Sequence, residues 1–217
     1  MRSLVIGATG GIGAAVADLL GKRGEVVRRG RSSHGLDVTR EPSVEAMFGG
    51  LSGVFDLIFV ATGALSSGAG PEKSLRAVTP DEMVAQFRLN TVGPALCLKH
   101  GSTFLPRDGR SVFAVLSARV GSIGDNGLGG WYSYRTSKAA VNQVVHSAAI
   151  EIGRKRKDAI VIALHPGTVA TSFTSGFPAH DKVTPPEAAA NIVRVIAGLS
   201  ASDTGGFFDW QGARVPW

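Results

Sequence analysis

The sequence predicts an α/β fold, a doubly wound parallel sheet of about seven strands with helices on both faces. Short apolar runs alternate with longer segments of helical periodicity along the whole chain. The first apolar run leads directly into a glycine-rich turn and a helical pattern. The 217 residues, 44% apolar and 18% charged, fit a single domain, 1–217, with a substantial core.

The first strand is expected at residues 3–6 and the first helix at residues 14–23, joined by a glycine-rich turn. Glycines let the backbone approach a phosphate closely, and a helix N-terminus offers free N–H groups to an anion. The turn therefore favours a dinucleotide site, with a plain strand–turn–helix connection as the alternative. The residues expected to bind the cofactor there are Gly7, Thr9, Gly11, Ile12 and Gly13.

The second strand, residues 25–28, ends in a basic segment. In nucleotide folds an acidic residue at this place binds the ribose hydroxyls, whereas arginine suits a 2′-phosphate. No Asp or Glu lies between this strand and Asp37, while Arg29, Arg31 and Ser32 can donate to a phosphate. The segment favours NADP over NAD as the cofactor, with a solvated loop as the alternative.

A third short strand is expected at residues 35–38, where Asp37 either caps the next helix or accepts from an adenine amino group. Asp37 and Val38 are included in the expected cofactor site. The next helix is expected at residues 43–48 and the next strand at residues 54–60. That strand runs into Ala61, Thr62 and Gly63, three small residues that let a ligand lie against the backbone.

A long helix is expected to start at residue 79 or 81 and to end near residue 100. Asn90 lies inside it, shortly before Gly93-Pro94, so we expect a local kink. Taken alone, Asn90 is interpreted as a surface residue. The following strand covers residues 111–116 and ends at Ser117.

Tyr134 and Lys138 stand four residues apart at the start of a helical pattern that continues through residues 139–152. Residues at this spacing share one helix face, with Cβ atoms about 5–6 Å apart. A neighbouring ammonium lowers the pKa of a phenol from about 10, which suits proton exchange with an alcohol or a carbonyl oxygen. Because such pairs are more often ordinary helix surface, this one is interpreted together with the other motifs.

The rest of the chain continues the alternation of strands and helices. The expected elements are a strand at 159–164, a helix at 186–199 and a strand at 206–209. His165, which ends the first of these strands, is interpreted as a packing residue. Residues 168–184 lack periodicity, contain Phe173, Phe177 and Pro178, and could form a flexible lid.

Together these residues resemble the short-chain dehydrogenase/reductase family along the whole chain, and within it the C-factor/sniffer-like carbonyl reductase group. The motifs that carry the resemblance are Gly7-x-x-x-Gly11-x-Gly13, Asn90, Tyr134 with Lys138, and Pro166-Gly167-x-Val169-x-Thr171. The resemblance implies a single-domain Rossmann fold. It also implies that Pro166, Gly167, Val169 and Thr171 hold the nicotinamide end of the cofactor.

The same resemblance implies a role for each residue of the active-site set. Tyr134 would protonate the carbonyl oxygen. Lys138 would lower the pKa of Tyr134 and hold the nicotinamide ribose, and Asn90 would hold a water. The family's serine usually lies three residues before a glycine, but that position, counted from Gly121, is Ala118. Ser117 is the expected catalytic serine, with Ser122 as the alternative. The family's Asn-Asn-Ala-Gly segment reads Val60-Ala61-Thr62-Gly63 here.

The resemblance implies an enzyme, an NADP(H)-dependent oxidoreductase that interconverts an aldehyde or ketone and its alcohol by hydride transfer. Tyr134 would be its general acid and base, and Trp131 and Phe173 could wall the substrate pocket. The alternative is a non-catalytic dinucleotide-binding regulator or signalling protein, because the serine is displaced and the C-factor group includes a developmental signal.

Composition argues against several other classes. Two basic runs, residues 28–31 and 154–157, contribute to the formal net charge of +6, but neither carries interleaved aromatics, so nucleic acid is not an expected partner. No apolar run approaches the roughly 20 residues of a membrane helix. With Cys97 as the single cysteine and no paired histidines, no metal site is expected. We expect a cytoplasmic protein with a small carbonyl or alcohol substrate, and the resemblance allows a homodimer.

Overall fold

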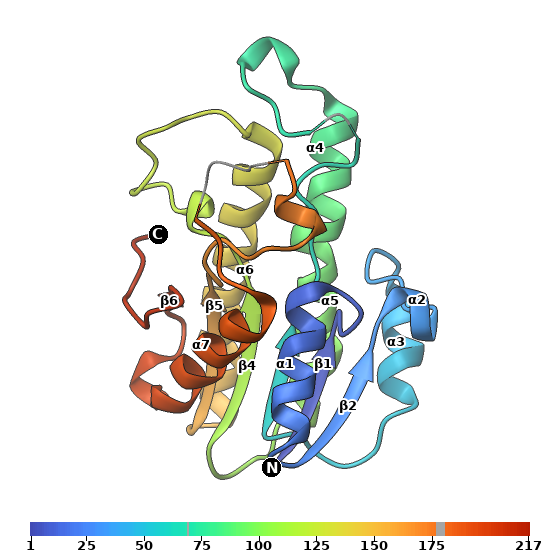
Figure 1. The fold of residues 1–217 in the computed structure, drawn as a ribbon. Helices are drawn as coiled ribbons and strands as arrows, with labels where there is room; N and C mark the ends of the chain where they lie inside the picture. Colours follow the sequence, from blue (N-terminus) through green and yellow to red (C-terminus); the bar gives the residue numbers. More distant parts are fainter. Residues whose placement is uncertain (69, 177–180) are drawn as a thin grey trace.

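In the computed structural model, which describes residues 1–68, 70–176 and 181–217, a sheet lies between two layers of helices (Figure 1). The strands are β1 Arg2–Ile6, β2 Glu25–Arg29, β3 Leu57–Val60, β4 Ser111–Leu116, β5 Ala159–Leu164 and β6 Phe207–Phe208. The helices are α1 Gly11–Gly21, α2 Arg31–His34, α3 Glu41–Gly49, α4 Pro80–Phe87, α5 Gly93–Gly101, α6 Tyr132–Lys155 and α7 Pro185–Gly198. The predicted fold class, a doubly wound α/β sheet, is confirmed.

The strand order is β2-β1-β3-β4-β5-β6, and all neighbouring pairs are parallel. The carboxyl ends of the strands therefore meet at one edge of the sheet, the upper edge in Figure 1. The chain changes direction of winding between β1 and β3, which lie side by side. In open α/β sheets ligands bind at this edge, beside the change of direction.

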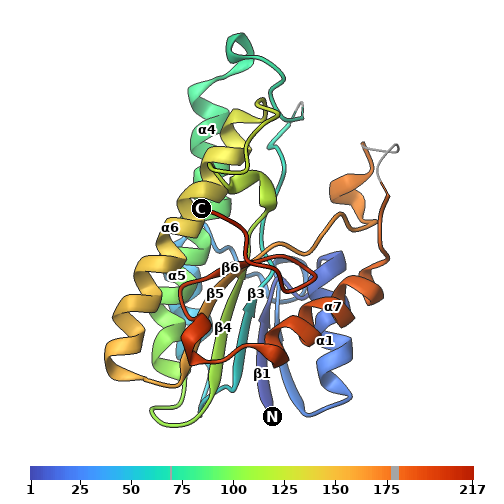
Figure 2. The ribbon, with the colours of Figure 1, turned by 90° about the vertical axis from the view of Figure 1, so that its left-hand side faces the viewer.

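Side chains of each central strand alternate between two apolar layers. Leu4 and Ile6 of β1 pack in the layer that contains α3, α5 and α6, whereas Val5 packs in the layer of α1 and α7. Figure 2 shows α5 and α6 on one side of the sheet and α1 and α7 on the other. Burial on both faces explains why the strands appear in the sequence as continuous apolar runs.

The part of the chain that the structure describes contains six strands, so the expectation of about seven is wrong. The expected strand at residues 35–38 does not form. Asp37 Oδ1 accepts hydrogen bonds from the backbone N (2.9 Å) and the hydroxyl (2.7 Å) of Thr39, which bends the chain, and Gly35 has a left-handed φ of +63°. Leu36 and Val38 are nevertheless buried in the core, which explains the apolar pattern.

The long helix expected near residues 79–100 is interrupted at Asn90. Thr79 caps α4 by accepting from Glu82 N at 3.3 Å, and the chain then widens into a π-turn, Arg88–Val92, before α5. Pro94 has no N–H to donate into a regular helix at this point. The irregularity predicted around Asn90 is therefore confirmed, as a widened turn.

Residues 168–184 are partly described. They contain a short helical turn, Ser172–Thr174, and an isolated bridge that pairs Val169 with Val183. The predicted lid residues Phe177 and Pro178 lie outside the described residues. The segment leaves β5 at the carboxyl edge of the sheet, where it can border a ligand site.

Candidate active site

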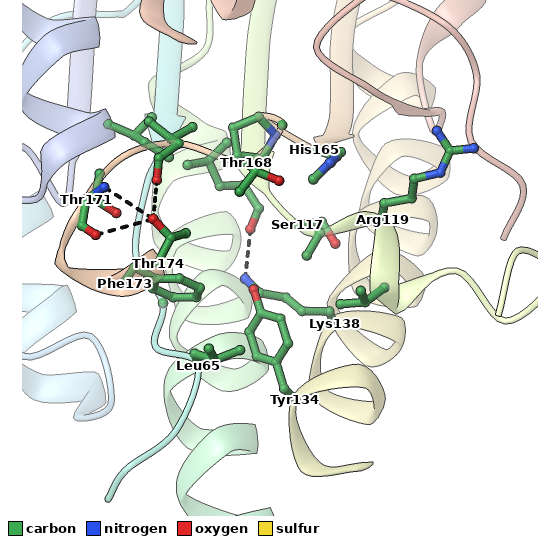
Figure 3. A pocket seen from close by; sticks show the side chains of 18 of the residues that line it. Leu65, Ser117, Arg119, Tyr134, Lys138, His165, Thr168, Thr171, Phe173 and Thr174 are labelled. Atoms are coloured by element: carbon green, nitrogen blue, oxygen red, sulfur yellow. Dashed lines mark hydrogen bonds between the residues drawn. The ribbon is translucent and has the colours of Figure 1, made fainter. Parts of the chain in front are cut away.

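A cavity of about 580 Å³ lies at the carboxyl edge of the sheet, among the loops that follow β1, β3, β4 and β5 and the first turns of α6 (Figure 3). The predicted site residues that line it are Gly11, Ile12, Gly13, Ala61, Thr62, Gly63, Ser117, Tyr134, Lys138, Pro166, Gly167, Val169 and Thr171. The predicted residues outside its lining are Gly7, Thr9, Arg29, Arg31, Ser32, Asp37, Val38 and Asn90. Most of the predicted site residues therefore border one cavity.

The glycine turn after β1 is packed too tightly for side chains. A Cβ at Gly7 would lie 2.7 Å from the Ala61 carbonyl oxygen, and a Cβ at Gly13 would lie 2.2 Å from the carbonyl oxygen of Gly7. The first hydrogen bond of α1 runs from Ala14 N to Gly10 O at 2.8 Å, and no side chain caps the helix. The N–H groups of residues 11–13 therefore lack intrahelical acceptors and can bind an anion in the cavity.

The basic segment after β2 lies against this turn. The carbonyl oxygen of Arg29 accepts from Gly7 N (2.8 Å) and Ala8 N (3.0 Å), which fixes the end of β2 beside the glycines. Arg31 and Ser32 are exposed in the first turn of α2, and neither side chain has a hydrogen bond to a described residue. Their donors remain available for a phosphate group at the rim.

Two further predicted cofactor residues serve the fold. The Asp37 carboxylate accepts two hydrogen bonds from Thr39, which is the first cause of its lowered pKa. Val38 is buried and contacts the chain at Gly93, where an added Cβ would lie 2.9 Å from its Cγ2 atom. Asp37 thus closes its own turn, and the prediction that it caps the next helix is wrong.

Tyr134 and Lys138 are both buried on one face of α6, with 5% and 3% of their surfaces exposed. The Lys138 Nζ atom donates to the Leu116 carbonyl oxygen at 3.0 Å and lies 5.9 Å from the centroid of the Tyr134 ring. Trp131 and Phe173 contact that ring edge-on, at centroid distances of 6.3 and 6.0 Å. Both aromatics line the cavity, as the sequence suggested.

Burial controls the protonation of this pair. It raises the pKa of Tyr134 above the usual value of a phenol and lowers the pKa of Lys138 to about 8. The four-residue spacing suggested that Lys138 lowers the pKa of Tyr134, but the pKa is raised. The loss of water around the phenol outweighs the effect of the Lys138 ammonium, which donates its hydrogen bond to Leu116 O instead. At neutral pH the phenol is therefore protonated.

The two candidate serines differ in their relation to the cavity. Ser117 lines it, but its hydroxyl donates to Asn142 Oδ1 at 2.6 Å. Ser122 does not line it, and its hydroxyl accepts from Asp125 N at 3.1 Å. Ala118, at the position where the family has its serine, lines the cavity with a methyl group. The Ser117 hydroxyl would have to give up its hydrogen bond to Asn142 before it could donate to a ligand, and Ser122 lies outside the cavity lining.

Asn90 is fully buried rather than on the surface. Its Oδ1 atom accepts from Ala64 N at 3.0 Å, and its Nδ2 atom donates to Ala64 O at 2.9 Å. Nδ2 also lies 3.1 Å from Ser137 Oγ on α6. Asn90 therefore ties the loop after β3 to the helix that carries Tyr134.

Glu72 is a structural contributor that the sequence did not reveal. It is buried, its Oε2 atom accepts from Ser133 N at 3.3 Å, and its Oε1 atom accepts from the Ser133 hydroxyl. Its backbone oxygen accepts from Trp131 N at 2.6 Å, where Trp131 has a left-handed φ of +53°. A carboxylate at a helix N-terminus is stabilising. Glu72 thus fixes the turn of α6 that presents Tyr134, from a position 61 residues earlier in the chain.

Two buried polar atoms at the cavity have no hydrogen-bond partner among the described residues: Thr62 Oγ1 and His165 Nδ1. Unpaired buried polar atoms are costly, so they often mark a place that a ligand completes. The tight glycine turn and the free N–H groups of residues 11–13 fit the pyrophosphate of a dinucleotide. His165, interpreted from sequence as packing, is therefore also part of the cavity wall.

Among the described residues, no group of three His, Cys, Asp or Glu side chains is gathered as a metal site would require. No helix within the described ranges is long and apolar enough to span a bilayer.

Known proteins share this sequence pattern. A family model described as Enoyl-(Acyl carrier protein) reductase matches residues 25–198. The 1-hydroxy-2-glutathionyl-2-methyl-3-butene dehydrogenase of Rhodococcus sp. (strain AD45) is 34% identical, over 99% of this chain and 98% of its own. The C-signal of Myxococcus xanthus is 39% identical, over 63% of this chain and 79% of its own.

Solved structures share the fold. Carbonyl reductase Sniffer of D. melanogaster superimposes with a TM-score of 0.85 at 23% identity, over 100% of this chain and 99% of its own. A protein described as a short-chain dehydrogenase/reductase from Burkholderia multivorans with bound NADP gives a TM-score of 0.83 at 25% identity, with the same coverage.

The family match covers most of the chain, and the Rhodococcus relative is similar over nearly all of it. Because relatives are named dehydrogenases and reductases, the alternative of a non-catalytic regulator is not favoured. The glycine turn, the Tyr134–Lys138 pair and the Pro166-Gly167 segment border one cavity in this chain. The chain belongs to the short-chain dehydrogenase/reductase family and is an oxidoreductase of the C-factor/sniffer-like group.

Proposed function

We propose that this enzyme depends on NADP(H) and interconverts an aldehyde or ketone and its alcohol, with Tyr134 as general acid and base. The observation that carries the proposal is that one cavity is lined both by the open end of α1 and by the buried pair Tyr134 and Lys138. Bound NADP(H) supplies the hydride. Residues 1–217 then act as one dinucleotide-binding and catalytic unit.

Tyr134 exchanges the proton. In reduction its hydroxyl donates to the carbonyl oxygen, and in oxidation the phenolate accepts the proton of the alcohol. Because burial raises the pKa of Tyr134, the phenol is protonated at neutral pH, which is the form that reduction needs. Lys138, with a pKa of about 8, is mainly charged at pH 7 and stabilises the phenolate that reduction leaves.

Other residues hold the reactants in place. Pro166, Gly167, Val169 and Thr171 line the cavity after β5 and suit the nicotinamide end of the cofactor. Asn90 holds the loop after β3 against α6. Its role in holding a water, and the role of Ser117 as the active-site serine, stay predictions.

NADP is the proposed cofactor because β2 ends in a basic segment. Arg29, Arg31 and Ser32 provide donors for a 2′-phosphate, and no carboxylate at the end of β2 is placed to bind a free ribose. The Burkholderia multivorans protein, which is described with bound NADP, supports the same choice.

The proposed substrate is a small apolar carbonyl compound or its alcohol. Leu65, Leu128, Trp131 and Phe173 line the cavity, and Leu128 is 93% exposed at its edge. Exposed apolar side chains grouped at a cavity commonly mark a binding surface. The Rhodococcus relative is named for a hydroxy compound, which agrees with alcohol–carbonyl chemistry. A homodimer, a cytoplasmic location and the absence of a nucleic-acid partner stay predictions.

Tyr134→Phe tests the mechanism. NADPH oxidation should be followed with a panel of aromatic aldehydes and aliphatic ketones, and NADPH binding by fluorescence. Removing the general acid is expected to lower kcat by about 100-fold or more while NADPH binding is unchanged. Tyr132→Phe is the matched control, because Tyr132 lies on the same helix outside the cavity lining. Equal turnover in Tyr134→Phe and the unmodified enzyme would reject the proposed role.

A further inference from the structure

The end of β5 brings a histidine beside the serine expected to act in catalysis. The β4–β5 register pairs Leu116 with Leu164, and Ser117 N donates to Leu164 O at 2.9 Å. Ser117 directly follows β4 and His165 directly follows β5, and both line the cavity (Figure 3). The backbone of His165 is also fixed to β6, because its backbone N–H donates to Phe208 O at 2.8 Å.

The residues that follow β4 offer no free hydrogen-bond donor on this wall of the cavity. The Ser117 hydroxyl is engaged with Asn142 Oδ1 at 2.6 Å, and the residue after it, Ala118, has no polar atom in its side chain. Arg119 is held by ion pairs to Asp125 at 2.5 Å and Asp209 at 3.7 Å. Ser117 and Arg119 therefore already interact with other side chains of the protein, and Ala118 has no donor to offer a carbonyl group that enters here.

His165 is not committed in this way. Its Nδ1 atom is buried without a partner, and no hydrogen bond joins either ring nitrogen to a described residue. Burial lowers the pKa of His165 to about 4; the nearby Asp209 raises it and Arg119 lowers it by smaller amounts. The ring is therefore neutral at physiological pH, with one N–H donor and one acceptor nitrogen. A neutral donor can bind a carbonyl oxygen without competing with Tyr134 as the acid.

We propose that His165 is a substrate-orienting residue whose imidazole donates a hydrogen bond to the carbonyl oxygen of the substrate, the role expected of Ser117. This inference rests on the proposed carbonyl–alcohol reaction. Tyr134 remains the proton donor, and His165 neither gains nor loses a proton. A substrate oxygen in the cavity cannot touch Nδ1 while that atom is buried, so the donor is Nε2, or Nδ1 after the ring turns.

Steady-state kinetics with NADPH and benzaldehyde test the assignment. His165→Leu is expected to lower kcat by about 100-fold, as for loss of one donor to a developing oxyanion. The NADPH dissociation constant should stay unchanged. His165→Asn and His165→Gln each return an amide donor, and one of them should recover most of kcat; Asn would identify Nδ1 as the donor and Gln would identify Nε2. Ser117→Ala compares the two candidates directly: if His165 has the role expected of Ser117, this variant lowers kcat less than His165→Leu does, since the Ser117 hydroxyl donates to Asn142.

His146→Leu is the matched control. His146 is also a half-buried histidine, its Nδ1 atom is bonded to Gly205 O at 2.9 Å, and it packs on Trp217 away from the cavity. This variant is expected to keep kcat even if its melting temperature falls. A loss of kcat as large as that of His165→Leu would show a general effect of removing a buried histidine and would overturn the assignment.

A binding measurement separates this inference from the proposed function. Benzaldehyde added to the complex with NADP⁺ cannot be reduced, so any change in the NMR resonances of His165 reports contact alone. A shift of these resonances that is absent in the His165→Leu spectrum supports the assignment even where turnover is slow. The assignment is overturned if the resonances do not move, if His165→Leu keeps full kcat, or if Ser117→Ala shows the large loss instead. An unmodified enzyme that binds NADPH but reduces no carbonyl would reject the proposed function, whatever His165 does.

Discussion

Replacing Lys138 by Met is expected to make the cofactor-free protein more stable at neutral pH. Lys138 is almost fully buried, and burial lowers its pKa from 10.5 to about 8. Each pKa unit corresponds to about 1.4 kcal/mol, so burying the charged form costs about 3 kcal/mol. Methionine fills a similar apolar space without a charge. Losing the hydrogen bond to Leu116 O removes about 1 kcal/mol, which leaves a net gain of about 2 kcal/mol.

The pH dependence follows from the direction of the shift. Since the pKa of Lys138 is lower in the folded protein, the unfolded chain binds more protons between pH 8 and 10.5. The stability of the unmodified protein therefore rises with pH across this window. Below pH 8 the full cost of the buried charge is present, and above pH 10.5 it disappears. The advantage of Lys138→Met should fall from about 2 kcal/mol at pH 7 to a small deficit above pH 10.5.

Urea unfolding of both proteins without NADPH, at pH 7 and at pH 10.5, measures this difference. Lys22→Met, which replaces an exposed lysine directly after α1, controls for the substitution itself. The same variant should lose carbonyl reduction, because the phenolate of Tyr134 would no longer have a neighbouring charge. A Lys138→Met protein that is less stable at pH 7, or that differs from the unmodified protein equally at both pH values, would refute the reasoning.

Two further substitutions test the cofactor end of the cavity. Gly13→Ala would place a Cβ 2.2 Å from Gly7 O, so it should lower the melting temperature and abolish NADPH fluorescence enhancement. Gly10→Ala is the control and should keep the melting temperature, because a Cβ at Gly10 has no atom nearer than 3.5 Å. Equal melting temperatures of the two variants would contradict the tight packing at Gly13. Arg31→Ala should weaken NADPH binding by at least about tenfold and leave NADH binding unchanged, as loss of a charge-assisted hydrogen bond to phosphate predicts. Equal weakening for both cofactors would show that Arg31 does not bind the 2′-phosphate.

Local periodicity was enough to predict most of the fold. β4 and β5 form where the sequence predicted them, because strands buried on both faces need uninterrupted apolar residues. Residues 35–38 share that apolar signal, yet they form no strand. The apolar side chains of Leu36 and Val38 report burial only, whereas the path of the backbone is set by Asp37 closing a turn with Thr39.

The spacing of Tyr134 and Lys138 predicted their shared face but not their pKa values. Spacing along a helix fixes which side chains are neighbours, whereas a pKa depends on how much water remains around them. Here water is excluded by Trp131 and by Phe173, which comes from a loop 39 residues further along the chain. Glu72, which holds the start of the same helix, comes from an earlier loop with no pattern of its own. Contacts between distant loops leave no periodic signal in the sequence.

Buried polar side chains away from the cavity are of two kinds. Asn90 is paired with Ala64 and Ser133 with Glu72, whereas Ser3 Oγ and Ser111 Oγ have no hydrogen-bond partner among the described residues. Those that border the cavity are left in unfavourable states: Thr62 and His165 each have an unpartnered atom, and Lys138 is charged without a carboxylate partner. Residues selected only for stability would be apolar at these places, because an unpaired buried group costs about 1–3 kcal/mol. A ligand can relieve this cost at the cavity, whereas Ser3 and Ser111 lie near the amino ends of β1 and β4, at the other edge of the sheet. An unpartnered buried group therefore indicates a ligand site only together with the cavity and the motifs that line it.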